Sequence, residues 1–289
     1  MIKSAAKFFW KNIRKKKIGR VLVSSPAFLR IMEKVYKKIY PESEVLYDAK
    51  SYKIYINPAD GGIARRYLIE GEHEGFSKDW VRKTKNPKIF YDIGANVGDW
   101  TLSMASSFPD CRVFSFEPHP ILFQQMTRSI GINGFLNVVA YDFGLGSNEK
   151  SYTLHCDPKN QGNNSICVLP ESENVNEIAI SVKRASDFVK YDGCHPTLIK
   201  LDVQGFEYEI LKDLTDTLLL KHCEFMIEID KNTSTELLEW IRWHIECGKL
   251  IDAIDEFNKR IIRVGDIGQL LELVQELTYF DIFITSNEK

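Results

Sequence analysis

The sequence predicts an α/β protein built on a doubly wound, Rossmann-like sheet, and three observations lead to that prediction. First, short apolar strands alternate with helical segments from Pro87 onward. Such alternation gives right-handed βαβ units, hence a mostly parallel sheet that helices cover on both faces. Second, 289 residues with 44% hydrophobic and 27% charged side chains are enough for a self-contained core. Third, an acid and two glycines follow the first strand of this pattern, where such sheets bind ligands.

The elements are predicted in chain order from local patterns. Residues 45–58 alternate enough to predict a small hairpin, which a turn at Gly61 and Gly62 follows. Short apolar runs then predict strands over residues 88–93, 112–117, 137–142, 198–203, 224–230 and 278–286. The intervening segments predict helices over residues 99–107, 120–130, 207–214 and 235–247. Residues 152–182 are irregular and partly β. We expect three parts: a helical extension (1–43), a small β or lid region (44–86) and the main domain (87–289).

The start of the chain is strongly basic, and the remainder is acidic. Residues 1–40 carry twelve basic side chains and one acid, a net charge of +11, whereas the rest of the chain has a net charge of −13. Apolar residues recur there at helical spacing, which predicts two basic amphipathic helices. They can rest on an anionic membrane surface or pack on the main domain, and we slightly favour the membrane. The acidic remainder argues against a nucleic-acid partner.

Cysteine use and hydropathy predict a cytoplasmic location, with peripheral membrane contact through residues 1–40 as an addition. The six cysteines form no CxxC pair, so we expect no metal site and reduced, mostly buried thiols. Lysines interrupt any apolar stretch near the start, which argues against a secretory signal. The longest uncharged stretch, residues 129–141, is too short and too polar to span a membrane.

The sharpest functional signal is the run YDIGANVGDW at residues 91–100. A predicted strand reaches Asp92, a glycine-containing turn follows, and a helix starts. Gly94 and Gly98 allow close approach of a ligand to the backbone, and the helix N-terminus offers free N–H groups. Glu117 ends the next strand, where an acid can accept both hydroxyl groups of an adenosine ribose. The two strand ends therefore predict a nucleoside-binding crevice.

Glycine spacing separates the two cofactor classes that use this layout. A dinucleotide fingerprint starting at Gly94 needs glycines at positions 96 and 99, where this chain has Asn96 and Asp99. Asp99 would also repel a pyrophosphate, whereas an amino-acid tail with an ammonium group is compatible with nearby acids. S-adenosylmethionine therefore fits better than NAD. An NAD-dependent oxidoreductase is the alternative, and an ordinary strand–helix turn is the structural explanation of the glycines.

Four sequence blocks resemble, in order and spacing, the FkbM family of S-adenosylmethionine-dependent methyltransferases: YDIGANVGDWTLSMA, VFSFEPHP, LIKLDVQGFEYEILKDL and FMIEID. The first two are common to many class I methyltransferases, and the third is more specific to the family. The resemblance covers approximately residues 60–285. It implies a class I methyltransferase fold with seven strands, the last antiparallel, and O-methylation of a hydroxyl group, commonly on a sugar or a natural product. The family usually has Glu where this chain has Gln204, so a charge expected beside the active site is missing.

The resemblance also implies residues that bind the cofactor. The methionine part would lie against Asp92, Gly94, Ala95, Asn96 and Gly98. The ribose would lie against Glu117 and Pro118, and the adenine against Asp142 and Phe143. Glu74 would be a cofactor or lid residue. Asp142 is equally well explained as an acid in a surface turn, and a solvated charged loop is the favoured alternative for Glu74. His119 is expected to cap the following helix rather than to contact adenine.

Asp202 and Glu207 are the candidate catalytic residues. Asp202 ends the fourth strand of the main domain, so it points toward the same crevice. Methyl transfer from a sulfonium depends on alignment, and a carboxylate within hydrogen-bond reach can accept the proton of the attacking hydroxyl. We expect Asp202 to be that base or a substrate anchor, whereas Glu207 can instead favour the helix dipole. Candidate substrate-binding residues are Glu228 and, in a polar loop that is otherwise a simple turn, Asn164 and Ser165.

The sequence as a whole predicts an S-adenosylmethionine-dependent O-methyltransferase that acts on a hydroxyl group of a saccharide, glycolipid or natural product. The alternatives are the NAD-dependent oxidoreductase and a non-catalytic binding module on a methyltransferase scaffold, which Gln204 makes conceivable. Expected partners are a small-molecule or glycan acceptor and, through residues 1–40, an anionic membrane surface.

Overall fold

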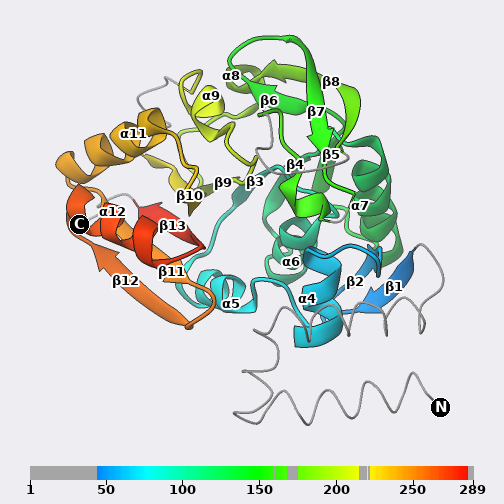
Figure 1. The fold of residues 1–289 in the computed structure, drawn as a ribbon. Helices are drawn as coiled ribbons and strands as arrows, with labels where there is room; N and C mark the ends of the chain where they lie inside the picture. The colour runs from blue at the N-terminus through cyan, green and yellow to red at the C-terminus, as the bar shows by residue number, and fades with distance from the viewer. Residues whose placement is uncertain (1–43, 159, 168–174, 215–219, 221, 286–289) are drawn as a thin grey trace.

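A computed structural model describes residues 44–158, 160–167, 175–214, 220 and 222–285. The two predicted helices of residues 1–43 lie outside the described residues. A sheet with the strand order β12–β11–β13–β10–β9–β3–β4–β5 runs through the molecule (Figure 1). In chain order its strands are β3 (Ile89–Ile93), β4 (Arg112–Phe116), β5 (Val138–Tyr141), β9 (Thr197–Leu201), β10 (Glu224–Asp230), β11 (Leu250–Asp255), β12 (Arg260–Val264) and β13 (Tyr279–Thr285).

Strand directions confirm the mostly parallel sheet and its antiparallel last strand. β5, β4, β3, β9 and β10 pair in parallel, and β13 lies antiparallel between β10 and β11. The prediction of seven strands is short by one, because β12 extends the edge as a hairpin with β11. The apolar run of β11 is interrupted by Asp252 and Asp255, whose carboxylates pair with Arg263 and Arg260 of β12. These paired charges explain why the sequence pattern did not indicate the hairpin.

Helices cover both faces of the sheet, as a doubly wound fold requires. One face packs on α8 (Ala185–Phe188), α9 (Glu207–Leu211), α11 (Thr235–Glu246) and α12 (Ile267–Glu276). The other face packs on α5 (Gly75–Thr84) and α6 (Asp99–Ser107). Every residue of β3 and β9 is therefore buried, which explains their near-continuous apolar sequence. Of these helices, α5, α8 and α12 were not predicted.

The helix after β4 begins where its sequence predicts. In α7 (Pro120–Asn133), Pro120 occupies the first turn and the His119 imidazole accepts hydrogen bonds from the backbone N–H groups of Ile121 and Leu122. His119 is therefore the helix cap, as predicted. Gly134 ends the helix in the left-handed conformation.

Two smaller units flank the sheet. The predicted hairpin is β1 (Val45–Asp48) with β2 (Lys53–Ile56), and it packs with α4 (Ile63–Glu70) against α6 and α7. A second sheet consists of β6 (Gly144–Gly146), β8 (Asn176–Arg184) and β7 (Lys150–Cys156), and it lies at the top of Figure 1. Most of β7 and β8 falls in the stretch predicted to be irregular and partly β, whereas β6 precedes that stretch. Between β7 and β8 comes the short helix η1 (Gln161–Asn163).

The cysteines are evenly divided between buried and exposed positions. The expectation of mostly buried thiols is wrong for half of the cysteines: Cys111, Cys156 and Cys223 are buried, whereas Cys167, Cys194 and Cys247 are exposed. All six are free thiols. Within the described residues, no helix is long and apolar enough to cross a membrane.

A buried ion pair joins α5 to α6. The Asp99 carboxylate accepts hydrogen bonds from the ammonium group of Lys78, the imidazole of His73 and the hydroxyl of Tyr67. Lys78 and Asp99 are 1% and 2% exposed. Burial alone would raise the pKa of Asp99, but Lys78 and His73 hold it well below its ordinary value. Asp99 is thus compensated by α5 and does not line the cavity described below, so its predicted repulsion of a pyrophosphate has no structural basis.

We expect Lys78→Met to lower the free energy of unfolding by about 3–5 kcal/mol, because it leaves the Asp99 carboxylate buried without its cation. Urea denaturation followed by circular dichroism measures the change. Lys88→Met is the control, because the Lys88–Asp110 pair is exposed and such pairs contribute about 0–1 kcal/mol. Equal losses in the two variants would contradict this role of the buried pair.

Candidate active site

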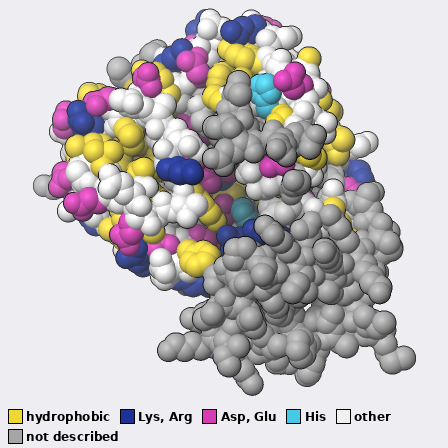
Figure 2. Space-filling model, viewed as in Figure 1, with side chains coloured by type: hydrophobic (Ala, Val, Ile, Leu, Met, Phe, Trp, Pro, Cys, Tyr) yellow, Lys and Arg dark blue, Asp and Glu magenta, His cyan; other side chains and the backbone are white. Residues whose placement is uncertain are grey.

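A cavity of about 320 Å³ lies at the carboxyl ends of the central strands. Its wall includes a residue that ends or follows each of β3, β4, β9 and β10: Gly94, Glu117, Asp202 and Asp230. The start of α4 and residues 160–164 form the opposite wall. Figure 2 shows a hollow near the centre of this face, with acidic and basic side chains around it. Both its position and its volume are typical of a small-molecule site in an open α/β sheet.

The turn after β3 brings two strand ends into contact. Gly94 has a φ of +85°, and a Cβ at this position would lie 2.0 Å from the carbonyl oxygen of Asp202. Only glycine fits there. The N–H groups of Gly94 and Ala95 both donate to the carbonyl oxygen of Phe116. This turn therefore ties the ends of β3, β4 and β9 together and leaves the backbone of Gly94 open to the cavity.

Asn96 connects the turn to the opposite wall. It has a φ of +53°, a conformation that asparagine tolerates better than most residues. Its side chain accepts a hydrogen bond from the Val97 N–H and donates one to the carbonyl oxygen of Gln161. The Asn96 amide thus holds the 160–164 loop over the cavity, which explains an asparagine where a dinucleotide fingerprint has glycine.

Glu117 presents a carboxylate to the cavity. Its two oxygens accept hydrogen bonds of 2.7 Å from the backbone N–H groups of Asn96 and His119. Burial raises the pKa of Glu117 to about 7. Because a carboxylate has about four acceptor positions, it can also accept the two hydroxyl groups of a ribose. The residue fits the nucleoside part of the expected cofactor.

Asp92 is buried and does not line the cavity. It is 1% exposed, and its Oδ2 accepts a hydrogen bond of 2.6 Å from the Thr101 hydroxyl. Its Oδ1 has no hydrogen-bond partner among the described residues. Gly98, with a φ of +85°, starts α6 against Met126, and neither Gly98 nor Ala95 lines the cavity.

Asp202 and Glu228 form an acidic wall of the cavity, and Gln204 links their carboxyl groups. The amide nitrogen of Gln204 donates to Asp202 Oδ1 at 2.9 Å and to Glu228 Oε2 at 2.6 Å. The ammonium group of Lys200 donates to Asp202 Oδ2 at 2.8 Å. Burial would raise the pKa of Asp202, but Lys200 lowers it below its ordinary value. Gln204 itself has a φ of +52°, so the turn after β9 places its amide between the two carboxyl groups.

Glu74 lies in the cavity wall beside α6. It accepts a hydrogen bond from the indole N–H of Trp100, and the imidazole of His73 is 3.6 Å from its other oxygen. Its side chain is 9% exposed. The loop is therefore not the solvated charged loop that the sequence favoured.

Several predicted residues do not meet at the cavity. Asp142 is exposed, and Phe143 packs on Phe116 and Phe188, so neither lines the wall in the position expected for adenine. Ser165 donates its hydroxyl proton to the carbonyl oxygen of Gln204, whereas its neighbour Asn164 does line the cavity. Pro118 lines it beside Glu117.

Glu207 is also outside the cavity wall. Its carboxylate is 4% exposed and accepts hydrogen bonds from the backbone N–H groups of Val203 and Gly205. Burial raises its pKa to about 7. Glu207 therefore holds the turn that carries Asp202, which is a positioning role and not a catalytic one.

The sequence did not indicate several residues of the wall, and three of them carry polar groups from α4 and β13. Arg65 and Arg66 reach the cavity from α4, and the guanidinium group of Arg66 donates to the hydroxyl of Tyr279 at 3.1 Å. Two adjacent arginines just after the Gly61–Gly62 turn were a usable signal. Tyr279 belongs to β13, and nothing in its local sequence indicated the contact.

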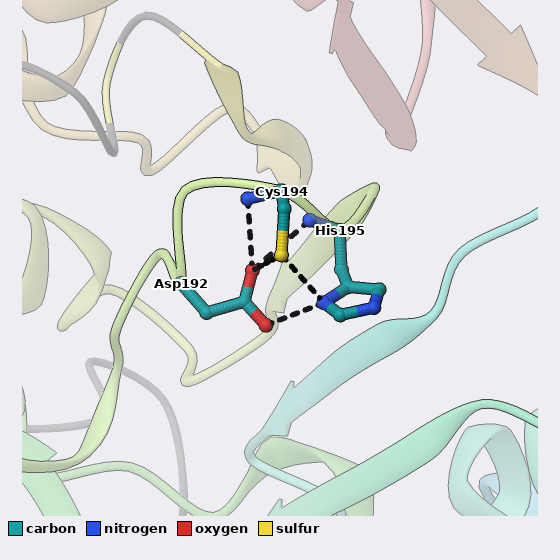
Figure 3. Close-up of side chains that lie close together, drawn as sticks. All are labelled: Asp192, Cys194 and His195. Carbon is teal, nitrogen blue, oxygen red and sulfur yellow. Dashed lines mark hydrogen bonds and ion pairs between the residues drawn. The ribbon is translucent and has the colours of Figure 1, made fainter.

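A second polar cluster lies at the amino ends of the central strands, whereas the cavity lies at their carboxyl ends. Asp192, Cys194 and His195 precede β9 (Figure 3), and their side chains could together hold a metal ion. The Asp192 carboxylate already accepts hydrogen bonds from two backbone N–H groups of this loop and contacts the His195 imidazole. The Arg112 guanidinium lies 3.4 Å from the same carboxylate. These contacts explain the conformation of the loop without a ligand.

Comparisons with known proteins agree with this geometry. The family model described as Methyltransferase FkbM domain matches residues 92–251. Methyltransferase 1 of Beauveria bassiana is 26% identical over 57% of this chain and 73% of that protein. Methyltransferase sdnD of Sordaria araneosa is 28% identical over 48% of this chain and 64% of that protein. The hexuronic acid methyltransferase AglP of Haloferax volcanii is 24% identical over 65% of this chain and 82% of that protein.

Proposed function

The chain belongs to the FkbM methyltransferase family, and on that premise we propose that it methylates a hydroxyl group of a saccharide, glycolipid or natural product. Its class is that of an S-adenosylmethionine-dependent methyltransferase, so neither an NAD-dependent oxidoreductase nor a non-catalytic module describes it. One observation supports methylation of a hydroxyl group. The turn at Gly94, the carboxylate of Glu117 and the acidic wall of Asp202 and Glu228 all line one cavity.

The residues of the cavity divide between cofactor and acceptor. When bound, S-adenosylmethionine supplies an electrophilic methyl group on a sulfonium. We assign its methionine part to Gly94 and Asn96, with Glu74 nearby, and its ribose to Glu117. The acidic wall would then hold the acceptor hydroxyl, and one of its carboxylates would take the hydroxyl proton. Alignment of the two reacting groups by this wall is the main contribution of the protein.

The polar lining favours a saccharide acceptor. Residues 160–164 contribute three asparagines and a glutamine to or beside the cavity, and amide groups both donate and accept hydrogen bonds. Two guanidinium groups, Arg65 and Arg66, lie on the same side and suit an anionic substituent. The relative named hexuronic acid methyltransferase supports the same class of acceptor.

Glu117→Gln should weaken S-adenosylhomocysteine binding roughly 10- to 100-fold above neutral pH, because hydrogen bonds to a charged group contribute about 1.5–3 kcal/mol. Since the pKa of Glu117 is raised to about 7 and the ionised form accepts both hydroxyls, the affinity of the unaltered protein should fall as the pH drops below that value. Isothermal titration over a pH series measures both effects. Glu207→Gln is the matched control, because burial raises the pKa of Glu207 similarly but its carboxylate is outside the cavity. An equal loss in the control would contradict the ribose assignment.

Incubation with methyl-labelled S-adenosylmethionine and a mixture of neutral and uronic-acid saccharides should give a labelled methyl ether. A methyl ether survives mild alkali, whereas a methyl ester on a carboxyl group is hydrolysed, so the label that remains after alkali reports hydroxyl methylation. Asp202→Asn should reduce the rate of methyl transfer, since it removes a carboxylate of the acidic wall, to which we assign the acceptor hydroxyl. Label that is lost completely in alkali would show ester formation and contradict the proposal.

We also propose that residues 1–43 hold the protein at an anionic membrane surface. The support is the net charge of +11 over residues 1–40, since each surface-near Lys or Arg contributes about 1 kcal/mol on anionic lipid.

Flotation with vesicles that contain phosphatidylserine should recover the full chain but not a chain that lacks residues 1–40. A charge-reversed variant at Lys15, Lys16 and Lys17 is the control for nonspecific effects of deletion, and it should float less than the unaltered chain. Neutral vesicles should recover little of either. Equal recovery of the full and shortened chains on anionic vesicles would refute the proposal.

A further inference from the structure

Three carboxyl groups converge where β9, β10 and β13 lie side by side. Glu228 of β10 and Asp281 of β13 are direct partners in the antiparallel register, so their side chains leave the same face of the sheet as cross-strand neighbours. Gln204 links Glu228 to Asp202 beyond the end of β9. Of the three, Asp202 and Glu228 line the cavity, whereas Asp281 is 8% exposed and lies outside its wall.

The three carboxyl groups are not equally compensated. Asp202 has Lys200 on one oxygen and Gln204 on the other. Glu228 shares the Gln204 amide, and Asp281 accepts a hydrogen bond of 3.1 Å from the Ser77 hydroxyl. Neither contact brings a positive charge. Like charges directly opposite on neighbouring strands are destabilising, so the Glu228–Asp281 pair is stable only if it retains a proton.

Charged groups face Glu228 from every neighbouring element. Asp202 and Lys200 face it from β9, Asp281 from β13 and Glu74 from the loop before α5. On the α4 side of the cavity, Arg66 is hydrogen-bonded to Tyr279. Of the four groups that face Glu228 from β9, β13 and the loop before α5, three are carboxyl groups and one, Lys200, is a cation. Burial raises the pKa of Glu228 well above its ordinary value, and the charges of Asp202 and Asp281 raise it further. Burial also raises the pKa of Asp281 well above its ordinary value, and the charges of Glu74 and Asp202 raise it further.

We propose that Glu228 carries a proton in the free protein, releases it when the sulfonium cofactor enters the cavity, and is then the base that accepts the proton of the acceptor hydroxyl. This inference rests on the proposed function for its last step. Asp202, ionised and held by Lys200, positions the acceptor. In the transfer, the oxygen–methyl bond forms as the carbon–sulfur bond breaks with its electron pair left on sulfur, and the hydroxyl proton passes to Glu228.

The positive charge of the cofactor determines that binding releases a proton from Glu228 rather than taking one up. A cation in the same cavity favours the ionised form of Glu228 and lowers its pKa. Between the lowered and the original pKa, binding releases up to one proton, and affinity for the cofactor rises up to tenfold per pH unit. S-adenosylhomocysteine has no sulfonium charge, so it lacks this contribution. A proton that Glu117 loses on ribose binding is common to both ligands and cancels in their difference.

Gln204 limits how many protons or cations the acidic wall needs. Its amide nitrogen has two hydrogens and donates to both carboxyl groups at once. The glutamate expected at this position from the family resemblance would add another negative charge between them. The glutamine therefore lets the wall hold a single proton on Glu228 rather than requiring a further cation.

The test is isothermal titration of the full chain with S-adenosylmethionine and with S-adenosylhomocysteine, in buffers of equal pH and different ionisation enthalpy, over a pH series through neutrality. The dependence of the heat on the buffer gives the number of protons released. We expect S-adenosylmethionine to release up to one proton more than S-adenosylhomocysteine in the unaltered protein. Because the ligands' own amino groups also titrate, the comparison between proteins decides the outcome.

Glu228→Gln should abolish the excess release, and Asp281→Asn should reduce it, because Glu228 without its charged neighbour is ionised before the cofactor binds. Asp230→Asn is the matched control on the same strand and the same cavity, and it should retain the release. Thermal denaturation checks that each variant is folded. No excess release in the unaltered protein, or the same release in Glu228→Gln, would overturn the inference.

Proton release on cofactor binding and methyl-ether formation are measured separately, so the role of Glu228 and hydroxyl methylation can fail independently. Methyl-ether formation without excess proton release overturns the role of Glu228 and leaves the proposed acceptor chemistry. Excess release that depends on Glu228, together with ester formation alone, supports the proton step on binding and refutes hydroxyl methylation.

Discussion

The close approach of Gly94 to the carbonyl oxygen of Asp202 is the constraint on which the site depends. No side chain fits between the two, so β3 and β9 end side by side and the turn after each strand faces the same cavity. The hydrogen bonds from Gly94 and Ala95 to Phe116 bring the end of β4, and with it Glu117, to the same edge. The ribose acceptor and the acidic wall are therefore positioned by backbone contacts, which do not depend on flexible side chains.

The polar interior is organised by unequal compensation of charge. Asp99 and Asp202 each have a lysine at hydrogen-bond distance, and both have pKa values below the ordinary one. Glu117, Glu207 and Glu228 have backbone or amide donors instead of a cation, and burial raises their pKa values. The pair of Asp99 with Lys78 holds α6 to α5, and the pair of Asp202 with Lys200 fixes the position of the acidic wall. The carboxyl groups that lack a cation can change protonation when a ligand binds.

The fold could be predicted from the sequence to the extent that its strands are continuous apolar runs. β10 and α6 have the predicted bounds, whereas β11 and β12 were missed because paired aspartates and arginines interrupt their pattern. At the site, Gly94, Glu117 and Asp202 lie where motif spacing places strand ends. Glu207, in the same motif as Asp202, and Asp142, which directly follows β5, do not line the cavity, since spacing does not reveal the direction of a side chain. Tyr279 lines the cavity and Asp281 lies beside Glu228 because β13 pairs with β10, a long-range pairing that local sequence does not record.

The position of β13 has a consequence for how the molecule is made. This late segment inserts between β10 and β11, and Phe280, Ile282 and Ile284 are buried there. While the nascent chain is still on the ribosome and these residues have not emerged, β10 exposes one unpaired edge and the β11–β12 hairpin has no neighbour to join. Biosynthesis therefore leaves the sheet open until β13 has been made, and a premature stop codon before Tyr279 would detach β11 and β12 from the sheet together with the missing β13.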